Sequence, residues 1–338
     1  MTWSAKRKAG KSVETDRQTI LKVEDLKKYF PVRRGFFQKI SAWVKAVDGV
    51  DFSIEQGSSL GLVGESGCGK STVAKVILKL LEPEGGRLIF KGKDIASFSP
   101  KEMRPLRKEM QIIFQDPYSS LNPRMTIGQS IEEGLRGMGL TRKMRTDRRN
   151  QLLEMVGIAS RAADRYPHEF SGGQRQRVGV ARALSVDPSL IICDEPVSAL
   201  DVSIQAQIIN LLKDLQEQFD LSYLFISHDL NVVGYFSDRI AVMYLGRIME
   251  YAEADELFKR PLHPYTSALL SAVPVPDPLR KKELTSLGGE VPSPLDPPPG
   301  CRFQGRCPQV ESRCRKEEIP LFSVDAGHLV RCWKTTGN

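Results

Sequence analysis

A segment that begins at Gly64 has the residue types and spacing of a phosphate-binding loop. Its sequence, Gly64-Glu65-Ser66-Gly67-Cys68-Gly69-Lys70-Ser71, fits the pattern G-x-x-x-x-G-K-[ST]. Glycines let the backbone wrap a phosphate, so that N–H groups and the start of the following helix face negative charge. In this pattern Lys70 reaches the β- and γ-phosphates of a nucleotide and Ser71 ligates Mg²⁺, and Thr72 beside it belongs to the same site. A glycine-rich turn without a ligand is the alternative, and the complete pattern argues against it.

Two adjacent carboxylates, Asp194 and Glu195, follow the apolar run Leu190–Cys193. Carboxylates at the end of a buried strand are costly to desolvate without a cation. We expect Asp194 to hold Mg²⁺ through water, and Glu195 to orient or deprotonate an attacking water. An Asp-Glu pair by itself often only caps a helix. The phosphate-loop pattern in the same chain favours the catalytic interpretation.

The elements that must position these residues alternate between strands and helices. A compact apolar strand at 60–63 leads into the loop, and helical periodicity follows it over 70–81. Further strands are expected at 20–30, 47–54, 88–95, 190–193 and 223–227, and helices at 204–218 and through most of 101–180. Strands that alternate with helices predict an α/β fold with a parallel sheet and helices on both faces.

Composition and charge exclude several classes of protein. The chain has 338 residues, of which 41% are hydrophobic, so it is long enough for about two globular domains. It has no apolar run long enough to cross a bilayer and no secretory signal, so a cytosolic chain is expected. The net charge of +8 resides in residues 1–45, and the remainder sums to zero. A nucleic-acid reader needs a basic face on its folded domain, so no nucleic-acid partner is expected. The basic end predicts a solvated tail, with attraction to an anionic membrane or acidic partner as the alternative.

Four further motifs carry a resemblance to a known family. They stand in the family's order: Gln115, then Phe170-Ser171-Gly172-Gly173-Gln174, Ser198-Ala199-Leu200-Asp201 and His228. With the phosphate loop and the carboxylates, they resemble the motifs of ATP-binding cassette (ABC) ATPases over residues 20–260. Phe170 stands where the family's signature usually has Leu. The resemblance implies a P-loop NTPase cassette with a RecA-like core, an antiparallel β subdomain and a helical subdomain at about 116–180.

The resemblance also implies roles for these residues. ABC ATPases act as head-to-tail pairs, so Ser171, Gly172, Gly173 and Gln174 are expected to contact the γ-phosphate of ATP bound by the partner. His228 is expected to contact the γ-phosphate on its own side, Gln115 the Mg²⁺ and the water, and Asp201 the subunit interface. Phe30 is expected to stack on adenine, and Tyr29 is the alternative residue for this role. Ordinary core packing is the alternative role for an aromatic side chain at this position. Hydrolysis is therefore expected to require dimerisation.

Two flanking segments narrow the resemblance to one branch of the family. Gln115–Arg124 and Arg260–Thr266, with the basic loop expected at 31–45, resemble the F-type ATPases of oligopeptide/dipeptide (Opp/Dpp) importers. This implies a peripheral protein on the cytoplasmic face of the inner membrane that powers peptide import. It also implies a D-type ATPase partner, two transmembrane permease subunits and, indirectly, a substrate-binding protein. The run after Gln115 is the expected contact for a permease helix.

The sequence is also compatible with other functions. A nickel importer shares much of the pattern, so the transported solute is undetermined. A soluble ABC ATPase that acts on nucleic acid and a catalytically weak cassette kept for assembly are the further alternatives. Measured turnover and binding to nucleic acid would distinguish them.

A cluster of cysteines marks the C-terminal region. Four of the six cysteines, Cys301, Cys307, Cys314 and Cys332, lie in the last 38 residues. Clustered cysteines in a reducing compartment are more often metal ligands than disulfides, but this spacing fits neither a zinc knuckle nor a common ferredoxin run. The pattern resembles the Opp/Dpp region that binds a 4Fe-4S cluster. Zinc and unligated thiols are the alternatives, and His328 is expected to be solvent-exposed rather than a ligand.

The domain organisation follows from these observations. Residues 1–19 are expected to form a basic flexible tail, and residues 20–260 the ABC ATPase domain. Twelve of the 21 prolines lie in 261–338. That stretch is expected to form a small loop-rich C-terminal domain that carries the four-cysteine site.

Overall fold

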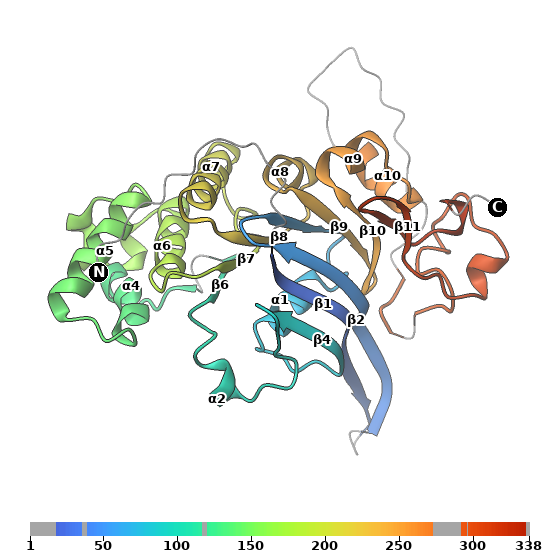
Figure 1. The fold of residues 1–338 in the computed structure, drawn as a ribbon, viewed down its shortest axis with the longest axis horizontal. Coiled ribbons are helices and arrows are strands. Elements are labelled where there is room, and N and C mark those ends of the chain that lie inside the picture. The colour runs from blue at the N-terminus through green and yellow to red at the C-terminus, as the bar shows by residue number, and fades with distance from the viewer. Residues whose placement is uncertain (1–17, 36–38, 117–119, 273–291, 296, 336–338) are drawn as a thin grey trace, which may run out of the picture. The chain divides into compact units, whose positions relative to one another are not determined.

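The computed structural model describes residues 18–35, 39–116, 120–272, 292–295 and 297–335 (Figure 1). The predicted tail at 1–19 therefore lies almost wholly outside the described residues. The same is true of Pro117–Ser119, within the expected permease contact. Two compact units are distinguished by their internal contacts. We call them the helical unit (described residues 18–20, with Ile54–Ser58 and Phe98–Ile226) and the strand-rich unit (Leu21–Ser53, Ser59–Ser97 and the described residues from Ser227 onward).

The strand-rich unit contains a four-stranded sheet. Its order is β2-β1-β4-β5, with bounds Lys39–Glu55, Thr19–Arg34, Gly85–Phe90 and Lys93–Asp94. β1 and β4 are antiparallel neighbours, as are β4 and β5. The buried residues of β1 include Leu21, Val23 and Leu26, so one side of the strand packs in the core. The alternation from Leu21 to Val23 is interrupted before Leu26, where the pairing register with β4 shifts between Glu24 and Lys27.

A second set of strands in the same unit carries the phosphate loop and the chain's C-terminal segment. The strands are β3 (Ser59–Val63), β9 (Arg239–Tyr244), β10 (Arg247–Glu253), β11 (Phe322–Asp325) and β12 (His328–Val330). β3 is parallel to β9, whereas β10 is antiparallel to both β9 and β12. All five residues of β3 are buried, as expected for a central strand of a parallel sheet. The C-terminal segment thus extends the same sheet.

Four α-helices lie in the described part of the strand-rich unit: α1 (Lys70–Ile77), α8 (Leu230–Phe236), α9 (Ala254–Lys259) and α10 (Pro264–Ser271). Two short 3-10 helices, η3 (Arg313–Arg315) and η4 (Trp333–Thr335), follow near the C-terminus. α1 is shorter than the predicted 70–81 helix. Lys79 has a φ of 52°, and a residue in this left-handed region cannot continue a right-handed helix.

The helical unit holds three parallel strands. β6 (Met110–Ile113), β7 (Leu190–Asp194) and β8 (Ser222–Ser227) are neighbours in the order β6-β7-β8. Every residue of β7 and β8 is buried. Parallel strands end at a common edge, so the residues that follow them are brought together there.

The helices of this unit fill most of the region that the sequence predicts to be helical. They are α2 (Pro100–Met103), α4 (Ile127–Arg136), α5 (Arg142–Met155), η1 (Ser160–Asp164), η2 (Pro167–Glu169), α6 (Gly172–Leu184) and α7 (Val202–Phe219). α7 agrees with the helix expected at 204–218. The short strand β6 is an addition, because four residues are too few to show a period.

Two sequence predictions are wrong. The basic segment 31–45 is not a loop, because β1 continues to Arg34 and β2 begins at Lys39. β4 pairs with β1 only along Leu21–Lys27. Pro31 lies beyond this pairing, so its missing N–H leaves no β4 carbonyl without a donor, and proline is tolerated there as it is at a sheet edge. His328 is not solvent-exposed: its side chain is 2% exposed and its Nε2 lies 2.8 Å from Glu250 Oε1.

None of the helices in the described part of the chain has the length and apolar character that crossing a membrane requires.

Candidate functional site

The phosphate loop has the backbone geometry that its sequence predicts. It connects the buried strand β3 to helix α1 through Gly64, Gly67 and Gly69, whose φ angles are 155°, 78° and 111°. A Cβ at Gly64 would meet the Met243 carbonyl oxygen at 2.1 Å, and one at Gly69 would meet the Ala46 carbonyl oxygen at 2.0 Å. Glycine is therefore required for both backbone shape and space.

The start of α1 is available to an anion. Gly69 is its N-cap residue and, as a glycine, provides no side-chain acceptor to the N–H groups of the first turn. Helix N-termini of this kind attract phosphate oxygens. Ser71 and Thr72, the next two residues after Lys70, are both half-buried in this turn. The geometry suits the predicted phosphate site.

Lys70 is turned back onto its own loop. Its Nζ donates to the Gly64 and Glu65 carbonyl oxygens at 2.7 and 3.0 Å, and the residue is only 4% exposed. The ammonium thus exchanges its hydration for two loop carbonyls, and a phosphate oxygen could replace them. The Cys68 thiol is buried as well, which raises its pKa. Its side chain lies in the loop's interior, with Lys70 Nζ 3.8 Å from its Sγ, and its place in the nucleotide site stays a prediction.

The two aromatic candidates for adenine binding have different partners. The Tyr29 hydroxyl donates to Asp48 Oδ1 at 2.5 Å, and burial together with this carboxylate raises the tyrosine pKa. Phe30 is half-buried, with Lys28 Nζ 5.4 Å from its ring centroid. Successive residues of a strand face opposite ways, so only one of the two can face a given ligand. The structural engagement of Tyr29 leaves Phe30 as the better candidate.

In the helical unit, the carboxylates lie at the end of a buried strand. Asp194 closes β7 and is 8% exposed. Glu195 follows with a φ of 49°, a left-handed conformation that is uncommon outside glycine, and its N–H donates to the Ile226 carbonyl oxygen at 2.9 Å. Strained backbone of this kind is concentrated at functional sites.

Gln115 is brought to Glu195 by the pairing of β6 with β7. Ile113 is opposite Cys193 in the register, so the residues that follow the two strands meet at one edge. Gln115 Nε2 donates to Glu195 Oε2 at 3.0 Å. The structure therefore joins the two residues expected to handle the attacking water, although they are 80 positions apart in sequence.

The signature segment begins helix α6. The Ser171 hydroxyl accepts a hydrogen bond from the Gln174 N–H at 3.3 Å, and Gln174 Oε1 accepts one from the Ser171 N–H at 3.0 Å. This is a capping box, which satisfies two backbone donors at the helix start. Both residues are exposed, so they can also face a partner.

The two glycines of the signature, and Phe170 at its start, pack closely against neighbouring residues. A Cβ at Gly173 would meet Ile204 Cγ2 of α7 at 2.4 Å, whereas one at Gly172 would meet Leu200 Cδ2 at 3.3 Å. Phe170 is 6% exposed and has the Arg165 guanidinium 4.9 Å from its ring centroid. The Phe170 departure from the family pattern is therefore accommodated in the core.

Asp201 and His228 are both exposed. Asp201 precedes α7 as its N-cap residue without a side-chain cap hydrogen bond. His228 lies between β8 and α8, just before Asp229, which caps α8 by accepting from the Asn231 and Val232 N–H groups. Their predicted roles at the interface and the γ-phosphate remain predictions.

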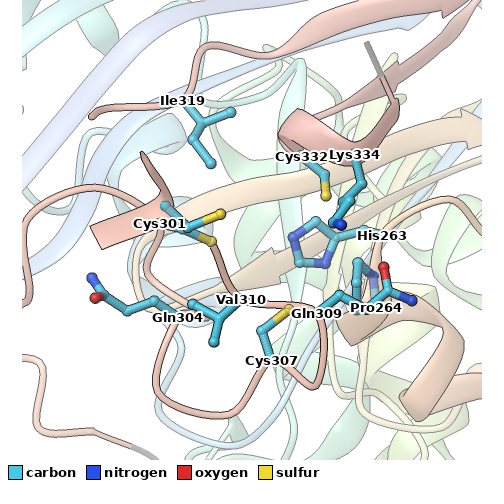
Figure 2. A pocket seen from close by; sticks show the side chains of 11 residues that line it. His263, Pro264, Cys301, Gln304, Cys307, Gln309, Val310, Ile319, Cys332 and Lys334 are labelled. Carbon is cyan, nitrogen blue, oxygen red and sulfur yellow. The ribbon is translucent and has the colours of Figure 1, made fainter. Parts of the chain in front are cut away.

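The four clustered cysteines line one pocket in the strand-rich unit (Figure 2). Figure 2 shows the side chains of Cys301, Cys307 and Cys332 around the same space as the His263 ring, and Cys314 also contributes to the lining. All six cysteines of the chain are free thiols. Among the residues that the structure describes, no group of three or more His, Cys, Asp or Glu side chains is arranged to hold a metal ion.

The thiols of this pocket are in a desolvating environment. Burial raises the pKa of Cys301 to about 11, and it also raises the pKa of Cys307 and Cys332. These thiols are therefore protonated at neutral pH in the absence of a ligand. Binding of a thiophilic group would release protons.

Sequence reasoning did not find two residues that hold the phosphate loop. The Tyr265 hydroxyl accepts a hydrogen bond from the Glu65 N–H at 3.0 Å, and Arg306 forms an ion pair with the Glu65 carboxylate. Arg306 stands beside Cys307 in the sequence, but nothing in that spacing indicates a partner 241 positions away.

Comparison with known proteins agrees with this geometry. Residues 47–198 match the ABC transporter family, and residues 249–314 match the oligopeptide/dipeptide transporter C-terminal region. The chain is 53% identical to the oligopeptide transport ATP-binding protein AppF of Bacillus subtilis (strain 168), over 94% of this chain and 98% of AppF.

Two solved structures show the same cassette fold. The chain is similar to cbiO1 of Clostridium perfringens, part of the ABC transporter complex cbiONQ (TM-score 0.62, 29% identity, 72% of this chain, 91% of cbiO1). It is equally similar to the ATP-binding cassette MJ0796, in a dimeric post-hydrolysis state bound to ADP and Pi (TM-score 0.62, 28% identity, 69% of this chain, 98% of MJ0796). The chain belongs to the ATP-binding proteins of ABC transporters, in the branch that carries the oligopeptide/dipeptide transporter C-terminal region.

Proposed function

We propose that this chain is the ATP-hydrolysing subunit of an importer for di- or oligopeptides. The observation that carries the hydrolytic activity is the hydrogen bond between Gln115 and Glu195 at the edge of the parallel strands. The import of peptides is supported by the C-terminal match and by the relative AppF, whose name describes oligopeptide transport.

Each candidate site residue has a proposed role in ATP binding or hydrolysis that follows from its side-chain chemistry. Lys70 and the first-turn N–H groups of α1 bind the phosphates of ATP, and Phe30 stacks on adenine. Ser71, Asp194 and Gln115 are the oxygen donors that suit Mg²⁺, which neutralises phosphate charge when bound. Glu195 orients and deprotonates the attacking water, and His228 stabilises the γ-phosphate.

The signature segment acts on the nucleotide of a second ATPase subunit. The exposed start of α6, with Ser171 and Gln174, presents a helix N-terminus to the γ-phosphate of that nucleotide, and Asp201 belongs to the same interface. We propose a D-type ATPase as this partner, two transmembrane permease subunits, and a substrate-binding protein that acts indirectly. The complex places the chain on the cytoplasmic face of the inner membrane.

The functional test is uptake of a labelled tripeptide by cells that lack the chain. Uptake should return with the parent chain but not with the Lys70→Ala variant, and the tagged parent should co-purify with two permeases and a second ATPase. Restored nickel uptake without peptide uptake would instead favour the related importers. Recovery with nucleic acid alone would contradict the transport function.

We propose further that the four-cysteine pocket holds a 4Fe-4S cluster. Support comes from the donor set: four thiols line one pocket, and an iron–sulfur cluster takes one thiolate at each of four separated corners. Cys301, Cys307, Cys314 and Cys332 would hold it, and when bound it would stabilise the segment or respond to redox conditions. Zinc is the alternative for the same thiols.

Metal analysis of anaerobically purified protein tests the cluster. We expect about four irons and four sulfides per chain with visible absorbance, and a loss of at least half of the iron in Cys307→Ser. Cys193→Ala is the matched control, because Cys193 is buried in β7 and does not line the pocket. Stoichiometric zinc without iron would establish the alternative, and the absence of both metals would refute a resident metal.

A further inference from the structure

Arg306, which belongs to the cysteine-rich segment (residues 301–332), forms an ion pair with Glu65 of the phosphate loop. Arg306 Nη1 lies 2.8 Å from Glu65 Oε2, and Arg306 Nη2 lies 3.1 Å from Glu65 Oε1. Two parallel bonds of this kind fix the orientation of both groups as well as their separation. The side chains are 7% and 24% exposed, so water screens the pair only weakly. The contact is more than a surface ion pair.

The arginine is supported by a packed aromatic cluster. Its guanidinium lies 6.0 Å from the Tyr244 ring centroid. Phe303, which is fully buried, packs edge-on against Tyr244 and tilted against Tyr265, with ring centroids 5.4 Å apart in both cases. The Arg306 N–H donates to the Phe303 carbonyl oxygen at 3.0 Å, so the position of the arginine follows that of the buried phenylalanine.

The same segment is anchored at a second point. Arg302 forms an ion pair with Asp48, and both side chains are nearly buried. Asp48 also accepts from Tyr29, the neighbour of the candidate adenine-binding residue. Although burial by itself raises the pKa of Asp48, the Tyr29 hydrogen bond and the Arg247 and Arg302 charges hold it below its usual range. The segment Cys301–Cys307 is thus anchored to β2 through Asp48 and to the phosphate loop through Glu65.

Glu65 links this anchor to the phosphate-binding lysine. Its carbonyl oxygen accepts from Lys70 Nζ, its N–H donates to Tyr265, and its carboxylate pairs with Arg306. Three separate contacts therefore converge on one loop residue. If Arg306 were absent, the carboxylate would lose its counter-charge beside a loop that binds anions, and it would repel phosphate.

We propose that Arg306 is a positioning residue of the nucleotide site, which holds Glu65 so that the phosphate loop keeps its binding geometry and its carboxylate stays neutralised. Arg306 touches neither nucleotide nor water in this role. The inference rests on the proposed binding of ATP by the phosphate loop. It makes the cysteine-rich segment part of the machinery that sets nucleotide affinity.

The test measures Mg-ATP affinity of the full-length chain in the Glu195→Gln background, which blocks turnover. Arg306→Ala should weaken binding roughly tenfold, the scale of one charge-assisted pair. Arg306→Lys keeps the positive charge but loses the two-point geometry, so its Mg-ATP affinity should lie between those of the Glu195→Gln parent and Arg306→Ala. Adding Glu65→Gln to Arg306→Ala should recover part of the affinity, because it removes the uncompensated carboxylate.

Arg315→Ala is the matched control. Arg315 is exposed and adjoins Cys314 as Arg306 adjoins Cys307, and its removal should leave affinity unchanged. In the assembled transporter with Glu195 intact, Arg306→Ala should raise the KM for ATP and leave kcat within about twofold, since it does not act on the water.

Three results would overturn the role of Arg306. They are unchanged affinity in a folded Arg306→Ala chain, no recovery in the double variant, or affinity losses in all variants that merely track their unfolding temperatures. A parent chain that binds no Mg-ATP would refute the proposed function instead, so the two failures are distinguishable.

Discussion

Glu195 combines an uncommon backbone conformation with a specific side-chain partner. Its φ of 49° is maintained by the N–H bond to Ile226, and Gln115 bonds its carboxylate. A non-glycine residue in this conformation costs free energy, so the surrounding strands must impose it. The result is a carboxylate whose direction is set by the fold, as its proposed role of orienting water requires.

At this scale, Glu195→Gln should separate binding from chemistry. The amide keeps the size of the side chain and can still bond Gln115, but it cannot accept a proton from water. We expect Mg-ATP affinity within about twofold of the parent and hydrolysis reduced at least ~100-fold, the usual contribution of a general base. Phosphate release in the assembled complex measures this. Sustained turnover would remove Glu195 from its role.

Helix α6 shows how one element serves structure and function together. Ser171 and Gln174 close its N-terminal turn, so these signature residues are explained locally as a capping box before any partner is considered. A variant that removes the hydroxyl would therefore confuse loss of helix stability with loss of contact to the partner's nucleotide. The element needs a substitution that keeps the cap.

Ser171→Asp is such a substitution. Aspartate caps helices as well as serine does, so the free energy of unfolding should change by less than about 1 kcal/mol. Its negative charge would repel the γ-phosphate at the partner's site, so hydrolysis by the dimer should fall at least tenfold.

Thr141→Asp is the control for this helix test. Thr141 caps α5 through the same contact, a side-chain oxygen that accepts from the N–H three residues later, and no nucleotide role is proposed there. Equal loss of activity in both variants, or full activity in Ser171→Asp, would exclude contact in trans.

At the scale of the whole molecule, the motifs are distributed between two compact units. The phosphate loop and the four cysteines belong to the strand-rich unit, whereas Gln115, Glu195 and the signature belong to the helical unit. The residues proposed to act on the chain's own nucleotide therefore come from both units, whereas the signature, proposed to act on a partner's nucleotide, comes from the helical unit alone. That proposed role of the signature makes full activity a property of an assembly.

Hydrolysis should accordingly depend on the second ATPase subunit. We expect the purified chain alone to turn over ATP slowly, with a rate per chain that rises with protein concentration as dimers form. Addition of the co-purified partner ATPase should raise the rate at least tenfold. The rate is measured by phosphate release across a dilution series. A concentration-independent rate equal to that of the complex would show that one chain suffices.

Features that are local in the chain could be predicted from the residues alone. The phosphate loop, the acids after an apolar strand and the signature each lie within eight residues, and glycine conformations and i, i+3 capping act over that range. Strand–helix alternation was sufficient for the α/β class, and helix α7 agrees with its periodicity. The prediction of a loop at 31–45 failed because this segment becomes strand through its pairing with other strands rather than through its own residue pattern.

Which distant residues meet depends on the folded chain and could not be predicted from local patterns. Gln115 reaches Glu195 through the register of β6 on β7, and His328 is buried against Glu250 because β12 pairs with β10. The ion pair of Arg306 with Glu65 joins residues that are 241 positions apart in the sequence. Such contacts are set by sheet register and by the packing of aromatic rings, and neither leaves a periodic signal in the residues concerned.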